Sequence, residues 1–169
     1  MWFRREKKMR VVTVDASGKE LGDERWVDIP KPDSFRSDGL VRIEGYVLRL
    51  LRASTRFTSL IIAAPTKQFA VHLWQRSGTA GFTLFVDWRA EPERERAIRQ
   101  FFAERELSPA QDYLGGNGNV PDAIRLLAYH LPQDVQFITG LTKDVLRQVY
   151  QVREQDALDF TYQEHHDAV

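Results

Sequence analysis

Three runs of mostly apolar residues in the middle of the chain predict β-strands. They are FTSLIIAA (57–64), FAVHLWQR (69–76) and FTLFVDWR (82–89), all rich in β-branched and aromatic residues. The segments between them, PTKQ and SGTAG, are short and contain residues that favour turns. This spacing predicts an antiparallel three-stranded meander, and we expect the rest of the chain to be arranged around it.

The order of residues within these runs indicates which side chains share a face. In the second run His72 and Trp74 alternate with Val71 and Leu73, so the two pairs are expected on opposite faces of the sheet. The first run is apolar almost throughout, which is typical of a strand covered on both sides or of a strand whose second face binds something. Trp74 and Trp88 are therefore the first candidates for an exposed aromatic patch.

Apolar residues recur at helical spacing in three other segments. The first segment predicts a helix over 38–53, with Ser37 or Asp38 accepting hydrogen bonds from its first free amides. The second begins at Pro92 and continues to about residue 106, with acidic residues at its positive end. The third opens at Pro132 and keeps one apolar face for about twenty residues. These patterns predict amphipathic helices that pack on the sheet.

Two segments before the third helix carry weaker patterns. Residues 108–119 are rich in Ser, Pro, Gly and Asn, which predicts a mobile loop. The run AIRLLAYHL (123–131) fits either a strand or a short helix, because periodicity cannot separate the two over so few residues. Pro121 and Pro132 on either side favour the strand. The predicted fold class is α+β, an antiparallel β-meander packed against amphipathic helices.

The two ends of the chain are expected to be less regular. Residues 9–14 and 25–29 predict a small hairpin, in which Trp26 would cover apolar surface. The run LDFTY near the C-terminus predicts a short strand, followed by a polar end that frays. We therefore divide the chain into an N-terminal arm with a hairpin (1–36), one α+β domain (37–162) and a flexible tail (163–169).

Composition and charge narrow the class of protein. The 169 residues are 43% hydrophobic and 28% charged, as in an ordinary globular domain. The 24 basic and 24 acidic residues cancel, which argues against a dedicated nucleic-acid binder. Cysteine is absent, which excludes disulfides and thiol chemistry. We find no apolar run of about 18 residues and no secretory signal, so we expect no membrane span and a cytoplasmic location.

The four histidines raise the question of a metal site. They are His72, His130, His165 and His166, with acidic residues near the last two. A zinc site needs three or four ligands held by fixed backbone, and adjacent histidines in a fraying tail converge poorly. We therefore expect a half-buried His72, solvated terminal histidines and no metal.

Other candidates for chemistry also have simpler interpretations. The GGNGN segment (115–119) lacks the lysine and Ser/Thr of a phosphate-binding loop. Asp87 and Glu91 are the nearest thing to paired carboxylates, but helix capping and the helix dipole explain Glu91. We therefore expect no catalytic residue and no cofactor, and we predict that the protein is not an enzyme.

A family resemblance adds to this picture. The meander and the segment LPQDVQFITGLTKDVLRQVYQVREQDALDFTY carry it, and residues 53–162 follow the same order of elements. In these respects the chain resembles the type III secretion chaperone-like and YbjN-like peptide-binding chaperones of bacteria. It departs from them in the N-terminal arm and in the Gly/Asn-rich loop.

The resemblance implies a non-enzymatic protein, often a homodimer, that holds a partner protein or peptide on its sheet or in a helix groove. We expect the contact surface to include aromatic and apolar residues of the meander, although some of these must belong to the core. The candidates are Phe57, Phe69, Val71, Trp74, Phe85 and Trp88.

Two other functions remain open at this point. One is an immunity or antitoxin-like protein that blocks a specific enzyme. The other is an enzyme with an unrecognised site, which would need a polar pocket where residues such as His72, Asp87 and His130 converge.

Overall fold

The structure, a computed structural model, describes residues 8–15, 18–28, 30–67, 69–115 and 124–165. Within these residues the helices are α1 (Gly39–Arg52), α2 (Pro92–Ala103) and α3 (Val135–Gln148). The strands are β1 (Lys8–Val14), β2 (Glu20–Asp28), β3 (Asp33–Phe35), β4 (Phe57–Ala64), β5 (Phe69–Arg76), β6 (Thr79–Asp87), β7 (Gln111–Leu114), β8 (Ile124–Leu131) and β9 (Leu158–His165). A short 3-10 turn, Pro65–Lys67, links β4 to β5.

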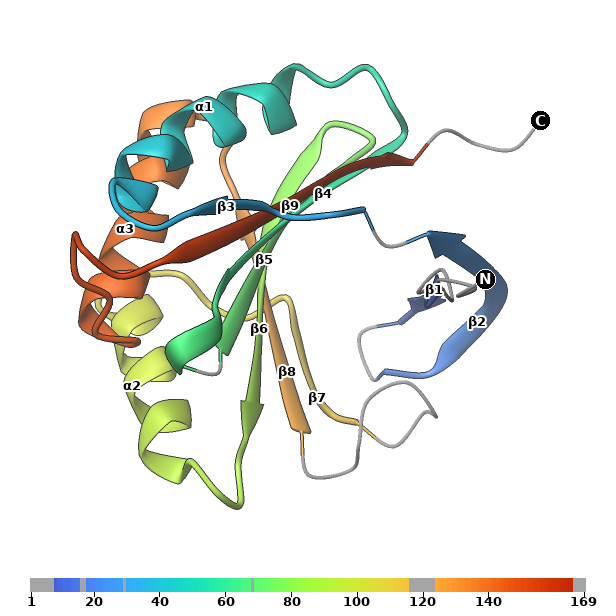
Figure 1. The fold of residues 1–169 in the computed structure, drawn as a ribbon. Coiled ribbons are helices and arrows are strands. Elements are labelled where there is room, and N and C mark those ends of the chain that lie inside the picture. The colour runs from blue at the N-terminus through green and yellow to red at the C-terminus, as the bar shows by residue number, and fades with distance from the viewer. Residues whose placement is uncertain (1–7, 16–17, 29, 68, 116–123, 166–169) are drawn as a thin grey trace, which may run out of the picture.

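Seven of these strands form one antiparallel sheet in the order β3-β9-β4-β5-β6-β8-β7. The predicted meander is present as β4, β5 and β6 at its centre, which confirms the α+β class. The three helices lie on one side of the sheet, and the hairpin of β1 and β2 lies on the other (Figure 1). The molecule therefore has three layers: helices, sheet and hairpin.

The turn between β5 and β6 is tighter than predicted. Ser77 and Gly78 form a two-residue turn, both with positive φ, and Arg76 pairs directly with Thr79. Turns of this kind match the right-handed twist of the strands they join. The strand β6 therefore begins at Thr79, and Gly81 belongs to the strand and not to the turn.

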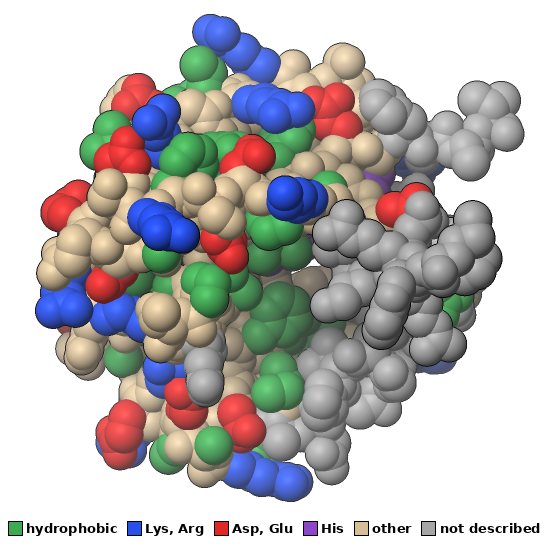
Figure 2. Space-filling view, viewed as in Figure 1, with side chains coloured by type: hydrophobic (Ala, Val, Ile, Leu, Met, Phe, Trp, Pro, Cys, Tyr) green, Lys and Arg blue, Asp and Glu red, His purple; other side chains and the backbone are tan. Residues whose placement is uncertain are grey.

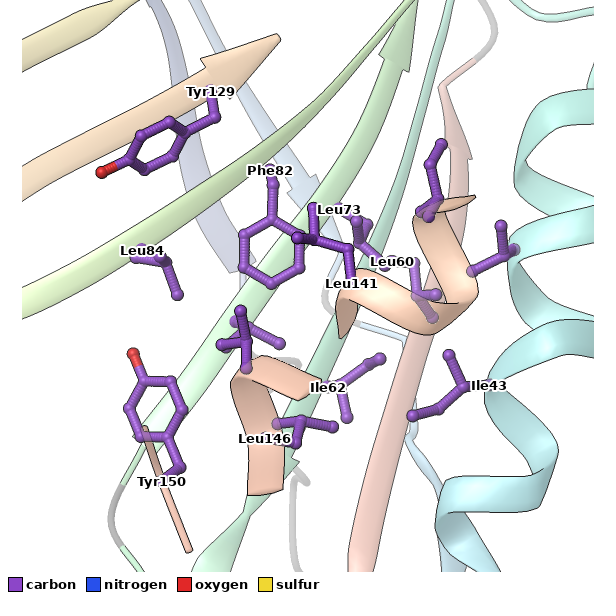
Figure 3. Packing of buried hydrophobic residues seen from close by; sticks show 14 of the residues in the cluster. Ile43, Leu60, Ile62, Leu73, Phe82, Leu84, Tyr129, Leu141, Leu146 and Tyr150 are labelled. Atoms are coloured by element: carbon purple, nitrogen blue, oxygen red, sulfur yellow. The ribbon is translucent and has the colours of Figure 1, made fainter. Parts of the chain in front are cut away.

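The core lies between the sheet and the helices (Figure 3). Alternate residues of the central strands point to this side because side chains alternate across a strand. Leu60, Leu73 and Phe82 are opposite one another on β4, β5 and β6, and each is at most 1% exposed. From the helices, Ile43 of α1 and Leu146 of α3 complete the packing and are fully buried. The apolar stripes identified in the sequence thus form one continuous core.

The segment predicted as a mobile loop contains a strand. Residues 111–114 form β7, which pairs with β8 along the edge of the sheet. The ambiguous run 123–131 is the strand β8 from Ile124 onward, which is its pairing partner. The prediction of an unstructured loop was wrong here because strand pairing, not local composition, forms β7. The remainder of the loop, 116–119, lies outside the described residues.

The C-terminal strand is longer and more central than predicted. β9 runs through His165 and pairs with β4 on one side and β3 on the other. Residues 163–165 therefore belong to the sheet and not to a flexible tail, while 166–169 lie outside the described residues. On its other edge β9 pairs with β3, so residues 33–35 belong to the sheet of the main domain and not to the arm.

The helix ends agree only in part with the predictions. α1 follows Asp38, but the Asp38 side chain pairs with Arg42 at 2.9 Å and does not cap the helix. α3 begins at Val135 and spans 14 residues, and Asp134 caps it by accepting a hydrogen bond from the Phe137 amide. The predicted start at Pro132 and length of about twenty residues were therefore wrong.

Candidate binding face

The sheet has a second face, which points away from the helices. We define the second face by the side chains of β4 to β9 that alternate with the core residues. They are Phe57, Ser59, Ile61, Ala63, Ala70, His72, Trp74, Gly81, Thr83, Phe85, Gln111, Tyr113, Leu126, Ala128, His130, Thr161, Gln163 and His165. Figure 2 shows hydrophobic side chains in a hollow near the centre of the view, beside the residues drawn in grey.

Trp74 is held rigidly on this face. Its indole lies on Gly81 of the neighbouring strand so closely that a Cβ there would overlap the ring. The Trp74 Nε1–H donates a hydrogen bond to Thr83 Oγ1 at 3.0 Å. His130 packs edge-on against the indole, with ring centroids 6.0 Å apart. These contacts fix one side of the ring, and the half-buried indole forms an aromatic platform.

Other apolar side chains extend this surface. Phe85 of β6 is 40% exposed and lies one residue beyond the last pair that β6 makes with β5. Phe57 packs against His165 with ring centroids 4.9 Å apart and is half-buried. Ile61 lies between them on β4 and is also half-buried. The second face therefore combines an apolar surface with incomplete burial, which is typical of a binding surface.

The hairpin is attached across this face near both edges of the sheet. Near β7, the Gln111 Nε2–H donates to the Asp15 carbonyl at 3.5 Å, and Gly18 rests on the Tyr113 ring. Near the opposite edge, the Gln163 Nε2–H donates to the Asp28 carbonyl at 3.3 Å. The hairpin thus spans the sheet from β7 to β9 and forms a wall opposite the second face (Figure 1).

Two polar atoms on the second face are buried without a hydrogen-bond partner in the described part of the chain. They are Nε2 of His72 and Oε1 of Gln163. Such atoms cost free energy because their interactions with water are lost and not replaced. Buried polar atoms without a partner in the described residues also occur on the helix side, for example Oε1 of Gln75 and the hydroxyl oxygen of Tyr150.

The environment of His72 also controls its protonation. Burial is the main cause that lowers its pKa from 6.5 to about 4, and the neighbouring His165 lowers it further. His72 is therefore neutral at pH 7. A neutral imidazole offers one donor and one acceptor, so one ring nitrogen is available as an acceptor.

The six predicted contact residues divide between the two faces. Phe57, Trp74 and Phe85 lie together on the second face. Val71 is fully buried in the core on the helix side, so it is not available to a partner. Phe69 also faces the helices, where it stacks on Tyr150 at 4.2 Å. These two residues are therefore among the candidates that belong to the helix side, as was expected for some of the six.

Trp88 lies in the turn after β6, half-buried, with the Arg89 guanidinium 5.3 Å from its ring. Trp26 was expected to cover apolar surface, but it is 62% exposed on β2. Neither indole is part of the second face. The local sequence pattern could not predict where either tryptophan lies relative to the sheet.

Several residues of the second face were not predicted. Gln163 and His165 come from β9, which the sequence analysis ended too early, and Tyr113 comes from β7, which it assigned to a loop. The alternation in LDFTYQEH places Thr161, Gln163 and His165 on one face, so this signal was present in the sequence. Tyr113 had no comparable signal.

The residues that would suggest catalysis are spread over the sheet. His72 is opposite Thr83 of β6, whereas Asp87 lies four residues further along, about 13 Å away at ~3.3 Å per residue. The Asp87 carboxylate accepts hydrogen bonds from the Arg89 and Ala90 amides and so caps the turn. The described residues contain no group of three or more His, Asp or Glu side chains suited to a metal ion.

Charged residues gather on the helix side near β7, where they hold that strand in place. Asp112 of β7 is bound by Arg99 of α2 at 2.9 Å and by Arg125 of β8 at 2.8 Å. Although partial burial raises the pKa of Asp112, hydrogen bonds from the two arginines outweigh this and leave it below its ordinary value. Glu95 pairs with the same two arginines. All four charges are engaged in structural contacts.

A shallow depression of about 550 Å³ lies beside the C-terminal end of α2. Its lining includes Arg99, which the ion pairs above already engage, and Tyr129, which stacks on Phe102 at 3.7 Å. Arg99 and Tyr129 therefore have structural roles, and the second face is the stronger candidate site.

Comparison with protein-family models, with curated proteins and with solved structures gives no match for this chain. The resemblance to peptide-binding chaperones therefore stays a prediction. Among the described residues, none of the helices has both the length and the apolar character required to cross a bilayer.

Proposed function

We propose that this protein binds an extended segment of a partner polypeptide on the second face of its sheet, under the hairpin, and makes or breaks no bond there. The observation that carries the proposal is the incomplete burial of aromatic side chains on the second face. Phe85 is 40% exposed, and Trp74 is half-buried but held rigidly by Gly81 and Thr83. Rigid aromatic side chains are frequent anchors in protein interfaces.

The size of the second face favours a polypeptide over a small molecule. Phe57 of β4 and Phe85 of β6, which are both partly exposed, lie two strands and six positions apart, roughly 22 Å at ~4.8 Å between strands and ~3.3 Å per residue. An extended segment of about six residues has the same length. The hairpin runs above this surface and supplies a second wall for such a segment.

The edges of the sheet are poorer docking sites than its face. The edge strands β3 and β7 have three and four residues, and short edge strands resist pairing with another chain. Pro30 and Pro32 precede β3 and lack the amide hydrogen that a longer strand would need. On β7, Asp112 places a charge at the edge. A partner strand is therefore better accommodated on the face.

This function fits a chaperone-like or adaptor protein of the cytoplasm. A chain without cysteine is unaffected by the reducing conditions there. The homodimer implied by the family resemblance stays a prediction, and sedimentation equilibrium of the full chain tests it.

The test uses two phenylalanines that are matched in exposure. Phe85 on the second face and Phe137 on α3 are both 40% exposed. A phage-displayed library of random dodecapeptides is selected on the full chain, and the affinity of the strongest synthetic peptide is measured by fluorescence anisotropy. We expect Phe85→Ala to weaken binding about tenfold or more, as for an interface anchor, and Phe137→Ala to leave it unchanged.

If the library gives no binding peptide, or if Phe137→Ala weakens binding and Phe85→Ala does not, the second face is not the binding surface. Both variants remove exposed side chains, so both are expected to fold. Cooperative unfolding in urea checks this before affinities are compared.

A further inference from the structure

We infer that the bound segment donates two backbone N–H groups to the second face, one to Nε2 of His72 and one to Oε1 of Gln163. This inference rests on the proposed function and specifies its chemistry. It assigns the ligand to the class of extended polypeptides with free backbone amides, and it distinguishes them from purely apolar molecules.

The first argument is the state of the two atoms without a ligand. Each is shielded from solvent, and each lacks a hydrogen-bond partner in the described residues. A buried group without a partner in a folded protein needs an explanation, and a partner supplied by a ligand is one. Binding would replace a lost interaction with water at both atoms, so these hydrogen bonds contribute more than a hydrogen bond on an exposed surface.

The second argument is that the two atoms require donors. Gln163 donates through Nε2 to the Asp28 carbonyl, which leaves Oε1 as an acceptor. His72 is neutral at pH 7, and its Nε2 accepts when the ring proton is on Nδ1. A peptide backbone presents a donor at every residue except proline, whereas a fatty acyl chain or another hydrocarbon presents none.

The third argument is the spacing of the two acceptors. His72 pairs with Ile61 of β4, and Gln163 pairs with Ser59 of the same strand. The two residues are therefore two strands and two positions apart, which is roughly 12 Å. In an extended segment, the N–H groups of residues i and i+4 point to the same side and are about 13 Å apart. One segment crossing β4 diagonally can therefore reach both acceptors.

The position of the hairpin indicates how the segment enters. The Asp28 carbonyl, which accepts from Gln163, belongs to β2. A segment that reaches Gln163 Oε1 must therefore pass next to this end of the hairpin. Because both acceptor atoms are buried, a segment reaches them only when the groups that cover them are displaced.

The experiment uses the dodecapeptide selected on the full chain. Each amide of the peptide is replaced in turn by an ester, which removes one N–H donor and keeps the shape of the chain. We expect two positions, four residues apart, at which the ester weakens binding to the wild-type protein about tenfold, the effect of one hydrogen bond to a buried group.

The same peptides are then measured with two protein variants. With His72→Leu, one of the two sensitive positions is expected to lose its sensitivity, and with Gln163→Leu the other is expected to lose it. Gln136→Leu on α3 is the control outside the second face, because the Gln136 side chain is exposed and donates to Glu44 on α1. It should leave both sensitive positions unchanged. His72→Phe and Gln163→Met replace any leucine variant that does not fold.

The result separates this inference from the proposed function. A peptide that needs Phe85 but shows no ester sensitivity coupled to His72 or Gln163 overturns the inference and leaves the proposed function intact. A peptide that is insensitive to Phe85→Ala overturns the proposed function. Sensitive positions that remain sensitive with both leucine variants show that the donors bind elsewhere, and this outcome also overturns the inference.

Discussion

The two faces of the central sheet differ in how completely they are packed. On the helix side, the residues of β4, β5 and β6 that face the core are almost completely buried, and Leu60 and Phe82 have no exposed surface. On the second face Phe85 is 40% exposed, and Phe57, Ile61 and Trp74 are only half-buried. Both faces belong to the same strands, so the difference comes from what covers them.

This difference separates the part of the protein that provides stability from the part that is available for binding. Close packing on the helix side accounts for the fold. The second face carries aromatic surface and polar atoms at a cost to stability, which natural proteins often accept at functional sites. The comparison therefore predicts that equivalent substitutions have opposite consequences on the two faces.

The largest effect is expected from neighbouring phenylalanines of β6. Phe82→Ala removes a fully buried ring and should lower the free energy of unfolding by about 3–5 kcal/mol. Phe85→Ala removes a partly exposed ring from the second face and should cost about 1 kcal/mol or less. Urea unfolding of both variants measures the difference. Equal losses in the free energy of unfolding would show that the second face is packed as closely as the helix side.

The pH dependence of stability should reveal His72. Its pKa is about 4 in the folded protein, so the unfolded chain binds a proton near pH 6.5 that the folded chain does not. The free energy of unfolding should therefore be highest above pH 6.5 and fall as the pH drops from 6.5 toward 4, by up to about 3 kcal/mol. Urea unfolding at a series of pH values measures this.

The matched variant for this measurement is His72→Leu. In this variant the fall in the free energy of unfolding that His72 causes between pH 6.5 and 4 should be absent. At pH 7 the variant should be as stable as the wild type or more stable, because a buried atom without a partner is removed. If the wild type and the variant lose stability in parallel over this pH range, His72 is not held in its neutral form by the fold.

Two glycines test whether Trp74 is held as described. A Cβ at Gly81 would overlap the Trp74 indole, so Gly81→Ala should cost about 1–3 kcal/mol and displace the ring. Gly45 in α1 has open space around it, so Gly45→Ala should raise stability by about 1 kcal/mol through helix propensity. Urea unfolding gives both values. A neutral Gly81→Ala would mean that Trp74 is free to move.

The smallest effect concerns the attachment of the hairpin. Gly18 and Gly22 both have positive φ, at 86° and 80°, so an alanine at either position carries similar backbone strain. At Gly18 the added methyl would also overlap the Tyr113 ring, whereas at Gly22 it meets nothing within 4 Å. Amide hydrogen exchange should show faster opening of the hairpin in Gly18→Ala than in Gly22→Ala. Equal rates would contradict the contact with Tyr113.

The parts of the fold that the sequence predicted are those with strong local patterns. The meander and the helix over 38–53 have clear periodicity, and the structure confirms both. β7 and the end of β9 were missed because strand pairing decides them: Gln111–Leu114 becomes a strand through pairing with β8, and 163–165 through pairing with β4. Local composition carries little information about such distant partners.

For the candidate site too, local patterns were predicted correctly and features that depend on strand pairing were missed. The alternation in the second run correctly separated His72 and Trp74 from Val71, but selecting residues by aromatic or apolar character alone added Val71 and Phe69, which face the helices. The polar members of the face could not be recognised without the strand order. Gln163 acquires its place next to Ser59 only when β9 pairs with β4.

The most direct test of the central claim locates the partner on the protein. p-Benzoylphenylalanine is placed at position 85 or at position 137, two sites with the same exposure on opposite sides of the molecule. After irradiation with the selected dodecapeptide, mass spectrometry measures the fraction of protein joined to the peptide. We predict a strong adduct at position 85 and background levels at position 137. A strong adduct at position 137 with background at 85 would contradict binding on the second face.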